Sequence, residues 1–465
     1  MLDLALFLFL IVFLAIGFRR PFVWVLAYLY VDILAPGKMG WTFMPILQSS
    51  LITFIAAFAG WVLTDPKHNS RFTFRQFLLL ALLAYCFWTT SFADFPESAA
   101  AKWDWVWKAL VFAIFLPLTL TTRLRIEATI LIMMLGMAAI IIGPGIKVVL
   151  GGGGYENQLF LVNDNSGLYE SSVLACMAIA VIPLILWLTK SGTVFPPDWR
   201  VRLFAYALIF ACLLIPVGTE ARTGLVCIAV LGALMFRHVK RKVLFGFAGA
   251  IAAVAALPFL PSSFYERMST IGSFQQDESA STRIAVWSWT LDYVAENPRG
   301  GGFDAFRGNA FTYDLPIEQK SGNTTAVKRV EVTDEGRAYH SAYFEVLGEQ
   351  GIIGFAIWSL LQLTGLWQMG WIRRKYQNRT GEDEQWQAPL ATALGKAQII
   401  YLVGALFTGI GYQPFMLMLL AVQIGFTTYV KQCEAKHAPV PSWKRRQQAA
   451  QLSPDAAGKA KAAGA

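Results

Sequence analysis

Apolar residues in this chain are gathered into long blocks that short polar segments separate. A helix needs about 20 mostly apolar residues to cross the hydrocarbon core of a bilayer. Blocks that approach or exceed that length lie at 2–17, 22–34, 43–63, 77–92, 106–120, 126–142, 168–188, 203–217, 224–236, 243–260, 344–371 and 394–430. The last block is long enough for two passes broken near Gly409 and Gly411, so the pattern predicts about 12 or 13 membrane-spanning helices.

Composition agrees with this pattern. Hydrophobic residues make up 56% of the chain and charged residues 15%, whereas soluble domains are about a quarter charged. We therefore expect an all-α polytopic membrane protein. The block at 2–17 lacks a basic leading segment and a small-residue cleavage site, so we expect it to be a mature helix and not a signal peptide. The five cysteines show no CxxC spacing, which argues against a disulfide framework or a thiolate metal site.

Lysine and arginine crowd several short loops, and such loops face the cytoplasm in membrane proteins. The basic loops lie at 65–75, 121–125, 237–242 and 371–379. Counting helices between them leaves four segments outside, at 93–105, 143–166, 218–223 and 261–343. The formal net charge of +9 then reflects orientation in the membrane. Because no aromatic-basic module surrounds the charges, we expect no nucleic-acid partner. The side of the N-terminus stays open, because Arg19 and Arg20 also form a basic pair.

The chain divides into four parts on this basis. Residues 1–260 and 344–430 form the first and last sets of membrane helices, 261–343 form one large outside loop, and 431–465 form a cytoplasmic tail that we expect to be disordered. A loop this long is usually functional or disordered. The apolar spacing at 284–294 predicts a helix that Pro298 ends. The polar stretch 318–336 is expected to be mobile.

One histidine is placed to react on the outside. His68 and His238 lie in basic loops and His437 lies in the tail, so only His340 faces outward, where the large loop meets the next apolar block. An imidazole has an unperturbed pKa of about 6.5 and can accept a proton at neutral pH. The alternative is an interfacial histidine that caps or anchors the helix that follows.

Two arginines lie at the same outer border. Arg222 follows "GTEA" at the start of an apolar block, and Arg283 opens the predicted loop helix. Arginines at the hydrocarbon edge often mark anionic ligands, and the guanidinium fork matches phosphate oxygens bidentately. The alternative for Arg222 is a pair with Glu220 or contact with lipid headgroups. Since the chain has no DxD, HExxH or Walker motif, neither a divalent metal nor a cofactor is indicated.

Four segments carry a resemblance to a known family. They are "NDNSGLYES" at 163–171, "EARTGLVCIAV" at 220–230, "TRIAVWSWTLDYVAENPRGGGF" at 282–303 and "HSAYFEVLGEQGIIGFAIW" at 340–358. Together they resemble the O-antigen ligase and polymerase superfamily of bacterial surface-polysaccharide enzymes, over about residues 168–371. Ser341 stands where that family commonly has Asn. The first 150 residues look more like the ligases tied to exosortase-type loci.

The resemblance implies an inverting, metal-independent glycosyltransferase of the bacterial inner membrane with its active site in the periplasm. The donor would be a glycan on undecaprenyl diphosphate. His340 would be the general base, and Arg222 and Arg283 would bind the diphosphate. Tyr343 and Glu345 complete the expected substrate-binding set, although a position on the helix surface is an equal alternative for Glu345.

Among the superfamily's activities we favour the ligase, which transfers the glycan to lipid A–core. One long periplasmic loop holds the reactive set, and no second comparable loop is present. An O-antigen polymerase and a protein O-oligosaccharyltransferase would use the same donor and stay open. A lipid-linked glycan transporter is a different class, in which ionisable residues usually lie near mid-membrane within paired repeats. Here the charges lie at the borders.

Overall fold

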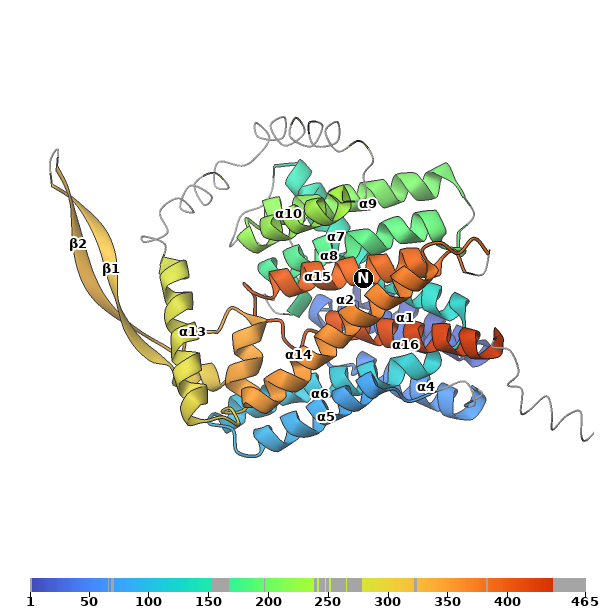
Figure 1. The fold of residues 1–465 in the computed structure, drawn as a ribbon, viewed down its shortest axis with the longest axis horizontal. Coiled ribbons are helices and arrows are strands. Elements are labelled where there is room, and N and C mark those ends of the chain that lie inside the picture. Colours follow the sequence, from blue (N-terminus) through green and yellow to red (C-terminus); the bar gives the residue numbers. More distant parts are fainter. Residues whose placement is uncertain are drawn as a thin grey trace, which may run out of the picture.

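The computed structural model is a bundle of long helices with a smaller unit at one end (Figure 1). It describes residues 2–65, 71–151, 167–195, 197–237, 278–321, 324–381 and 384–437, with a few single residues between these ranges. Most of the predicted span at 243–260 and the tail from 438 onward lie outside the described residues, as do the first four residues of the segment "NDNSGLYES".

Several helices are long and apolar enough to cross a membrane, which confirms the multi-pass expectation. Within the described ranges these are α1 (Leu2–Arg19), α7 (Arg123–Val149), α8 (Ser171–Ser191), α9 (Trp199–Gly218), α14 (Ala342–Tyr376) and α16 (Pro414–His437). Shorter apolar helices are α2 (Phe22–Leu34), α4 (Ser49–Thr64), α5 (Phe74–Thr90) and α10 (Arg222–Phe236). The total of about 12 spans stays a prediction.

The remaining elements connect these helices or lie at the end of the bundle. They are α3 (Pro36–Met39), α6 (Pro96–Thr119), η2 (Gly167–Tyr169), α13 (Glu278–Glu296), η6 (Ala305–Gly308), β1 (Ala310–Ser321), β2 (Thr324–Glu335) and α15 (Gln387–Gly404). Two separate helices, α15 and α16, occupy the last apolar block, which confirms the predicted break near Gly409.

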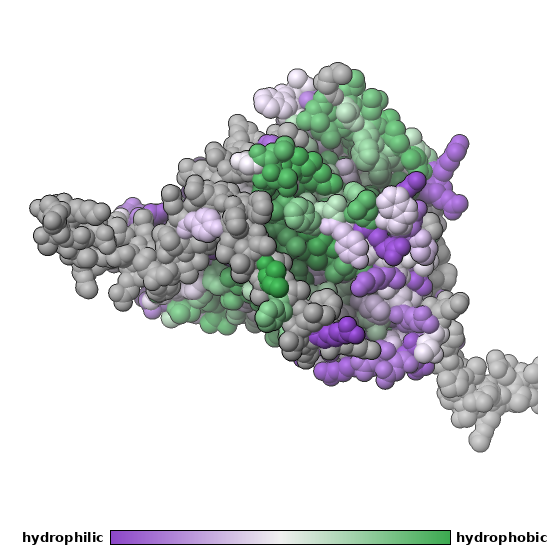
Figure 2. All heavy atoms as spheres, turned by 90° about the horizontal axis from the view of Figure 1, so that it is seen from above, coloured by the Kyte–Doolittle hydropathy of each residue, from purple (hydrophilic) through white to green (hydrophobic). Residues whose placement is uncertain are grey.

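Helix α8 lies deep in the bundle, because every residue from 173 to 185 is buried against neighbouring helices. Helices α7, α9, α10 and α15 pack around it. Helix α1 is peripheral, and its large side chains such as Phe18 remain exposed. Figure 2 shows hydrophobic residues over the middle of the molecule and polar residues gathered at the end on the right. An exposed apolar surface of this kind suits contact with lipid.

Two of the basic loops, at 65–75 and 121–125, meet at one end of the bundle. Arg125 forms an ion pair with Asp65 at 2.5 Å, and the Arg123 guanidinium donates to Ser191 O and lies 4.8 Å from the ring centroid of Trp386. These contacts confirm that loops far apart in sequence share an end, as the count of helices predicts. That this end faces the cytoplasm stays a prediction.

The large loop contains a two-stranded sheet as well as helices, so the all-α expectation needs a correction. Strands β1 and β2 pair in antiparallel register from Ala310↔Glu335 to Ser321↔Thr324, and the hairpin projects away from the bundle beside α13 (Figure 1). The stretch 318–336, expected to be mobile, is therefore largely strand. The strand signal is present, since "TTAVKRVEV" is rich in β-branched residues and alternates locally. The polarity of the stretch led instead to the expectation of a mobile segment.

Candidate functional site

The glycine-rich turn of the loop docks into a break in helix α14. Gly302 N donates to Glu349 O across 2.9 Å, and Ile352 N donates to Pro298 O across 2.9 Å. Between those two contacts, Gly351 adopts φ 61° and ψ −166° and interrupts the helix. A Cβ on Gly351 would lie 2.2 Å from Pro298 O. Glycine is required here by both the backbone angle and the close approach, so the sequence "PRGGG" serves to attach the loop to α14.

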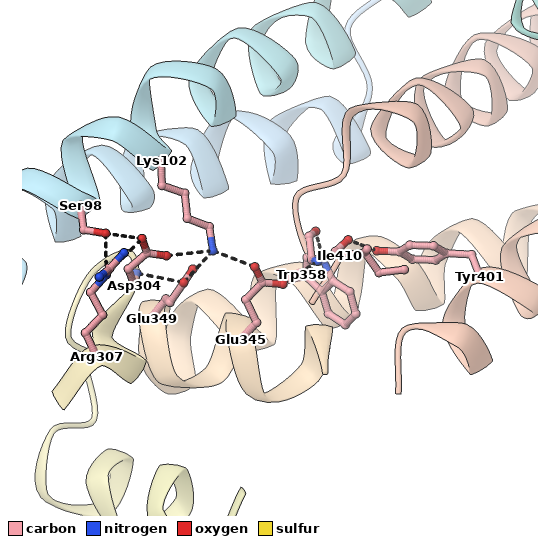
Figure 3. Close-up of polar contacts among 10 residues, drawn as sticks. Ser98, Lys102, Asp304, Arg307, Glu345, Glu349, Trp358, Tyr401 and Ile410 are labelled. Atoms are coloured by element: carbon pink, nitrogen blue, oxygen red, sulfur yellow. Dashed lines mark hydrogen bonds and ion pairs between the residues drawn. The ribbon is translucent and has the colours of Figure 1, made fainter. Parts of the chain in front are cut away.

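A buried lysine joins the loop, α6 and α14 (Figure 3). Lys102 Nζ lies 2.7 Å from an oxygen of Glu345 and 2.7 Å from an oxygen of Glu349, which are one turn apart on α14. Asp304 of the loop lies 3.7 Å from the same ammonium, and its carboxylate accepts a hydrogen bond from Ser98 of α6. The Glu349 side chain is fully buried. Buried carboxylates need such partners, because an unpaired buried charge is costly.

The backbone at His340 is held in a strained conformation from both sides. His340 has φ 47°, a left-handed value that only a few per cent of non-glycine residues adopt. Before it, Trp287 Nε1 of α13 donates to Tyr339 O across 2.9 Å. After it, Ala342 N donates to Ala405 O at the end of α15 across 2.8 Å. Strain that the surrounding structure fixes in this way is a feature of functional sites.

Two arginines set the electrostatic environment of the His340 imidazole. Partial burial, the guanidinium of Arg283 and that of Arg337 all lower the pKa of His340 below its usual 6.5. Arg337 also forms an ion pair with Asp334 at 3.0 Å. The imidazole is thus biased toward its neutral form, which accepts protons, and no hydrogen bond occupies it among the described residues. Arg283 and His340, two of the predicted site residues, lie close enough to interact.

Arg222 lies at the same end of the bundle, at the first position of α10. Farther along α10, Cys227 Sγ approaches Ile400 O of α15 at 3.8 Å. Ala405, which directly follows α15, accepts a hydrogen bond from Ala342 N, two residues after His340. Helix α15 therefore contacts α10, which begins with Arg222, and its C-terminal cap contacts the His340 segment.

Tyr343 and Glu345, the other two predicted site residues, make interactions within the protein. The Tyr343 hydroxyl donates to Leu402 O across 2.9 Å, and its ring meets that of Trp358 edge-on. Glu345 accepts from Gly411 N across 2.8 Å in addition to its ion pair with Lys102. Glu345 is buried and does not lie on the helix surface. Both residues fix α14 against the end of α15 and the turn that follows.

Sequence reasoning missed three contributors to this arrangement. Lys102 follows a run of alanines, and nothing in its neighbourhood points to a partner in the loop. The sequence around Asp304 likewise gives no sign of its partners in α6. The loop helix that contains Trp287 was predicted, but the hydrogen bond that its indole donates was not. A buried indole N–H usually finds an acceptor, so a search for such an acceptor could have identified the contact.

Two family models match the chain. Residues 1–193 match a family described only as of unknown function (DUF5935), and residues 207–359 match the O-antigen ligase family. The match over residues 207–359 supports the resemblance to the O-antigen ligase superfamily. Members of this superfamily are membrane glycosyltransferase-like enzymes. No curated protein gave a significant match to the chain.

The part matched to the O-antigen ligase family contains the arrangement around the strained histidine. Arg222, Arg283 and His340 all lie within it, as do the glycine-rich turn and the first half of α14. Lys102 lies in the region matched to the family of unknown function, so the buried ion pairs with Glu345 and Glu349 connect the two matched regions. The expected likeness of the first 150 residues to exosortase-associated ligases stays a prediction.

Proposed function

We propose that this protein is an O-antigen ligase of the bacterial inner membrane. It would transfer a glycan from undecaprenyl diphosphate to a sugar hydroxyl of lipid A–core on the periplasmic face. The observation that carries the proposal is His340, whose backbone is held at φ 47° and whose pKa is lowered by partial burial, Arg283 and Arg337. A neutral imidazole beside guanidinium groups suits a reaction that removes a proton from one substrate and releases an anion from the other.

The reaction would proceed in one displacement. His340 takes the proton of the acceptor hydroxyl as its oxygen bonds to the anomeric carbon, a general-base contribution of about 10²–10⁴-fold. The bond from that carbon to the phosphate oxygen breaks on the opposite face, so the configuration inverts. Undecaprenyl diphosphate leaves with the bonding electron pair. Arg222 and Arg283 stabilise the charge that develops on it, which is usually the largest catalytic effect.

The remaining site residues would hold this geometry. Glu345 fixes the start of α14 through its ion pair with Lys102, and Tyr343 does so through its hydrogen bond to Leu402 O. His340 lies two residues before this helix begins. Reaction groups must be placed to within about an ångström, and misplacement of that size can cost about 10² in rate. No step in this scheme uses a metal or a cofactor.

The test is transfer by purified protein reconstituted in liposomes. A defined polyprenyl-diphosphate glycan is supplied with lipid A–core, a free repeat-unit glycan or a peptide as acceptor, without ATP. Transfer to lipid A–core alone supports the ligase. Transfer to the glycan or the peptide would instead identify a polymerase or a protein glycosyltransferase. Movement of glycan-lipid across the liposome without any product would reject the enzyme proposal in favour of transport.

A further inference from the structure

A cavity of about 620 Å³ opens at the basic end of the bundle, remote from His340. It lies among the end of α8, the end of α10, the end of α14 and the first half of α15. Its lining comprises Pro183, Leu186, Trp187, Lys190, Ser191, Met235, Arg373, Tyr376, Gln377, Arg379, Gln385, Ala388, Pro389, Thr392, Ala393 and Lys396. Helices from both matched regions meet here, and the reaction at the other end leaves this cavity without a role.

Three of the four cations that line the cavity have no carboxylate partner among the described residues. None of the lining residues is acidic. Lys190, Arg373 and Lys396 form no ion pair with any described residue, and the Lys396 ammonium has only the sulfur of Met235 at 3.4 Å. Like charges brought together at the edge of a low-dielectric region repel one another. Three such cations around one cavity therefore favour an anionic ligand.

Neighbouring cations show that the imbalance is local. Lys375, outside the lining, lies 2.7 Å from Glu434, and Arg379, which is one of the lining residues, lies 3.8 Å from Glu384. Carboxylates are thus available at this end of the bundle and pair with cations outside or at the edge of the cavity. The other three lining cations, Lys190, Arg373 and Lys396, are available to an anionic ligand.

The inner wall of the cavity is apolar. Trp187 is buried at its base, and Leu186, Pro183, Ala388 and Pro389 continue that surface. A free phosphate ion gains nothing from such a wall, whereas an amphiphile with an anionic head and hydrocarbon chains matches both parts. Basic pockets between membrane helices at the bilayer surface are suited to phospholipid headgroups.

We propose that this cavity binds an anionic phospholipid, with its phosphate among Lys190, Arg373 and Lys396 and the start of its chains against Trp187. The lipid bridges α8, α14 and α15, and so stabilises the basic end of the bundle. This proposal needs the protein to lie in a membrane but does not depend on the glycosyltransferase assignment or on which leaflet faces the basic end.

Binding to the delipidated full-length protein tests the proposal. Native mass spectrometry and thermal unfolding in detergent are measured with phosphatidylglycerol, phosphatidylethanolamine and inorganic phosphate. We expect saturable binding of phosphatidylglycerol at least about tenfold tighter than phosphatidylethanolamine, with a higher melting temperature. Equal binding of the two lipids would overturn the proposal. Binding of phosphate as tight as that of phosphatidylglycerol would overturn the lipid as occupant and leave a free-anion site.

Two variants locate the binding. The double variant Arg373→Gln/Lys396→Gln is expected to bind phosphatidylglycerol about tenfold to thirtyfold more weakly. Arg374→Gln/Lys431→Gln removes the same charge from exposed positions outside the lining and should stay within about threefold of the parent protein. Lys396→Arg preserves the charge if the double variant folds poorly, and it should also stay within about threefold. Equal loss in the two double variants would place the lipid elsewhere.

Discussion

Trp287 Nε1 donates a hydrogen bond to Tyr339 O across 2.9 Å. Trp287 lies one turn after Arg283 on α13, and its ring stacks on Phe344 at the start of α14, with the ring centroids 4.9 Å apart. One side chain therefore sets the position of the loop helix that carries Arg283 relative to the backbone that carries His340. Through this contact, Arg283, which is proposed to bind the leaving diphosphate, is positioned relative to His340, which is proposed to take the proton of the acceptor hydroxyl.

The first prediction tests that alignment with Trp287→Phe. Phenylalanine preserves an aromatic ring near Phe344 but cannot donate to Tyr339 O, so the backbone before His340 loses one of its two restraints. We expect the transfer rate to fall about tenfold to hundredfold. The melting temperature in detergent should change little, because one hydrogen bond contributes about 1 kcal/mol. Trp289→Phe on the same helix is the control. A variant with the parental rate would show that the contact does not position the site.

The second prediction concerns the proposed base. Alanine at position 340 would combine loss of the imidazole with strain, since alanine at φ 47° costs about 1–2 kcal/mol. Asparagine tolerates that conformation better, so His340→Asn removes the base with less change in the backbone. We expect both His340→Ala and His340→Asn to lose about 10²-fold or more of the transfer rate while the protein still inserts and expresses. Substantial transfer by His340→Asn would reject the assignment of the base.

The third prediction follows from the direction of the shift in the His340 pKa. The base must be neutral to accept a proton, and neutral imidazole prevails above its pKa. Partial burial, Arg283 and Arg337 lower that pKa, so transfer should persist below pH 6.5 and be lost only as the pH falls through the lowered value. Arg337→Gln removes one of the positive charges and should move the acid limb of the rate profile to higher pH. Asp334→Asn removes the partner of Arg337 and should move the limb the opposite way. Identical acid limbs in all three proteins would mean that another group titrates.

The fourth prediction concerns the two arginines. Lysine retains the charge but cannot present a two-pronged donor to phosphate oxygens. Arg222→Lys and Arg283→Lys should each lower the transfer rate about 10²-fold, the usual cost of removing one group that stabilises transition-state charge. Rates and donor affinities are measured with the polyprenyl-diphosphate glycan. Arg200→Lys, on the exposed start of α9, is the control. Parental donor affinity and rate in both variants would remove these arginines from the site.

Sequence patterns predicted those features that depend on neighbouring residues. The apolar blocks predicted the described helices near their observed bounds. His340 was predicted to lie where the large loop meets the next apolar block, and it lies two residues before α14 begins. The split of the last block into α15 and α16 follows from its length and its glycines. Arg283 and His340 were expected to meet at the outer border. The charge of Arg283 is one of the causes that lower the pKa of His340, and their joint role in a site stays a prediction.

Contacts between residues far apart in the sequence could not be predicted from the pattern of apolar and polar residues. Lys102 and Glu349 are 247 residues apart, and only the folded bundle, in which α5 and α16 each pack against both α6 and α14, brings them together. The left-handed backbone of His340 has the same origin, because it is imposed by Trp287 and Ala405 and not by its neighbours in sequence. The strands β1 and β2 were missed for a local reason: polarity was taken as mobility in a segment whose residues favour extended backbone.

The last prediction tests the buried ion pairs that connect the two matched regions. Lys102→Met leaves Glu345 and the fully buried Glu349 without their cation. Removing one partner of a buried ion pair costs about 3–5 kcal/mol, so the melting temperature in detergent should fall well below that of the parent protein. Lys108→Met on the same helix removes an exposed pair with Asp104, which contributes about 0–1 kcal/mol, and is the matched control. Glu349→Gln added to Lys102→Met takes away one uncompensated charge and should recover part of the loss. Equal melting temperatures for Lys102→Met and Lys108→Met would show that the cluster does not hold the loop to the bundle.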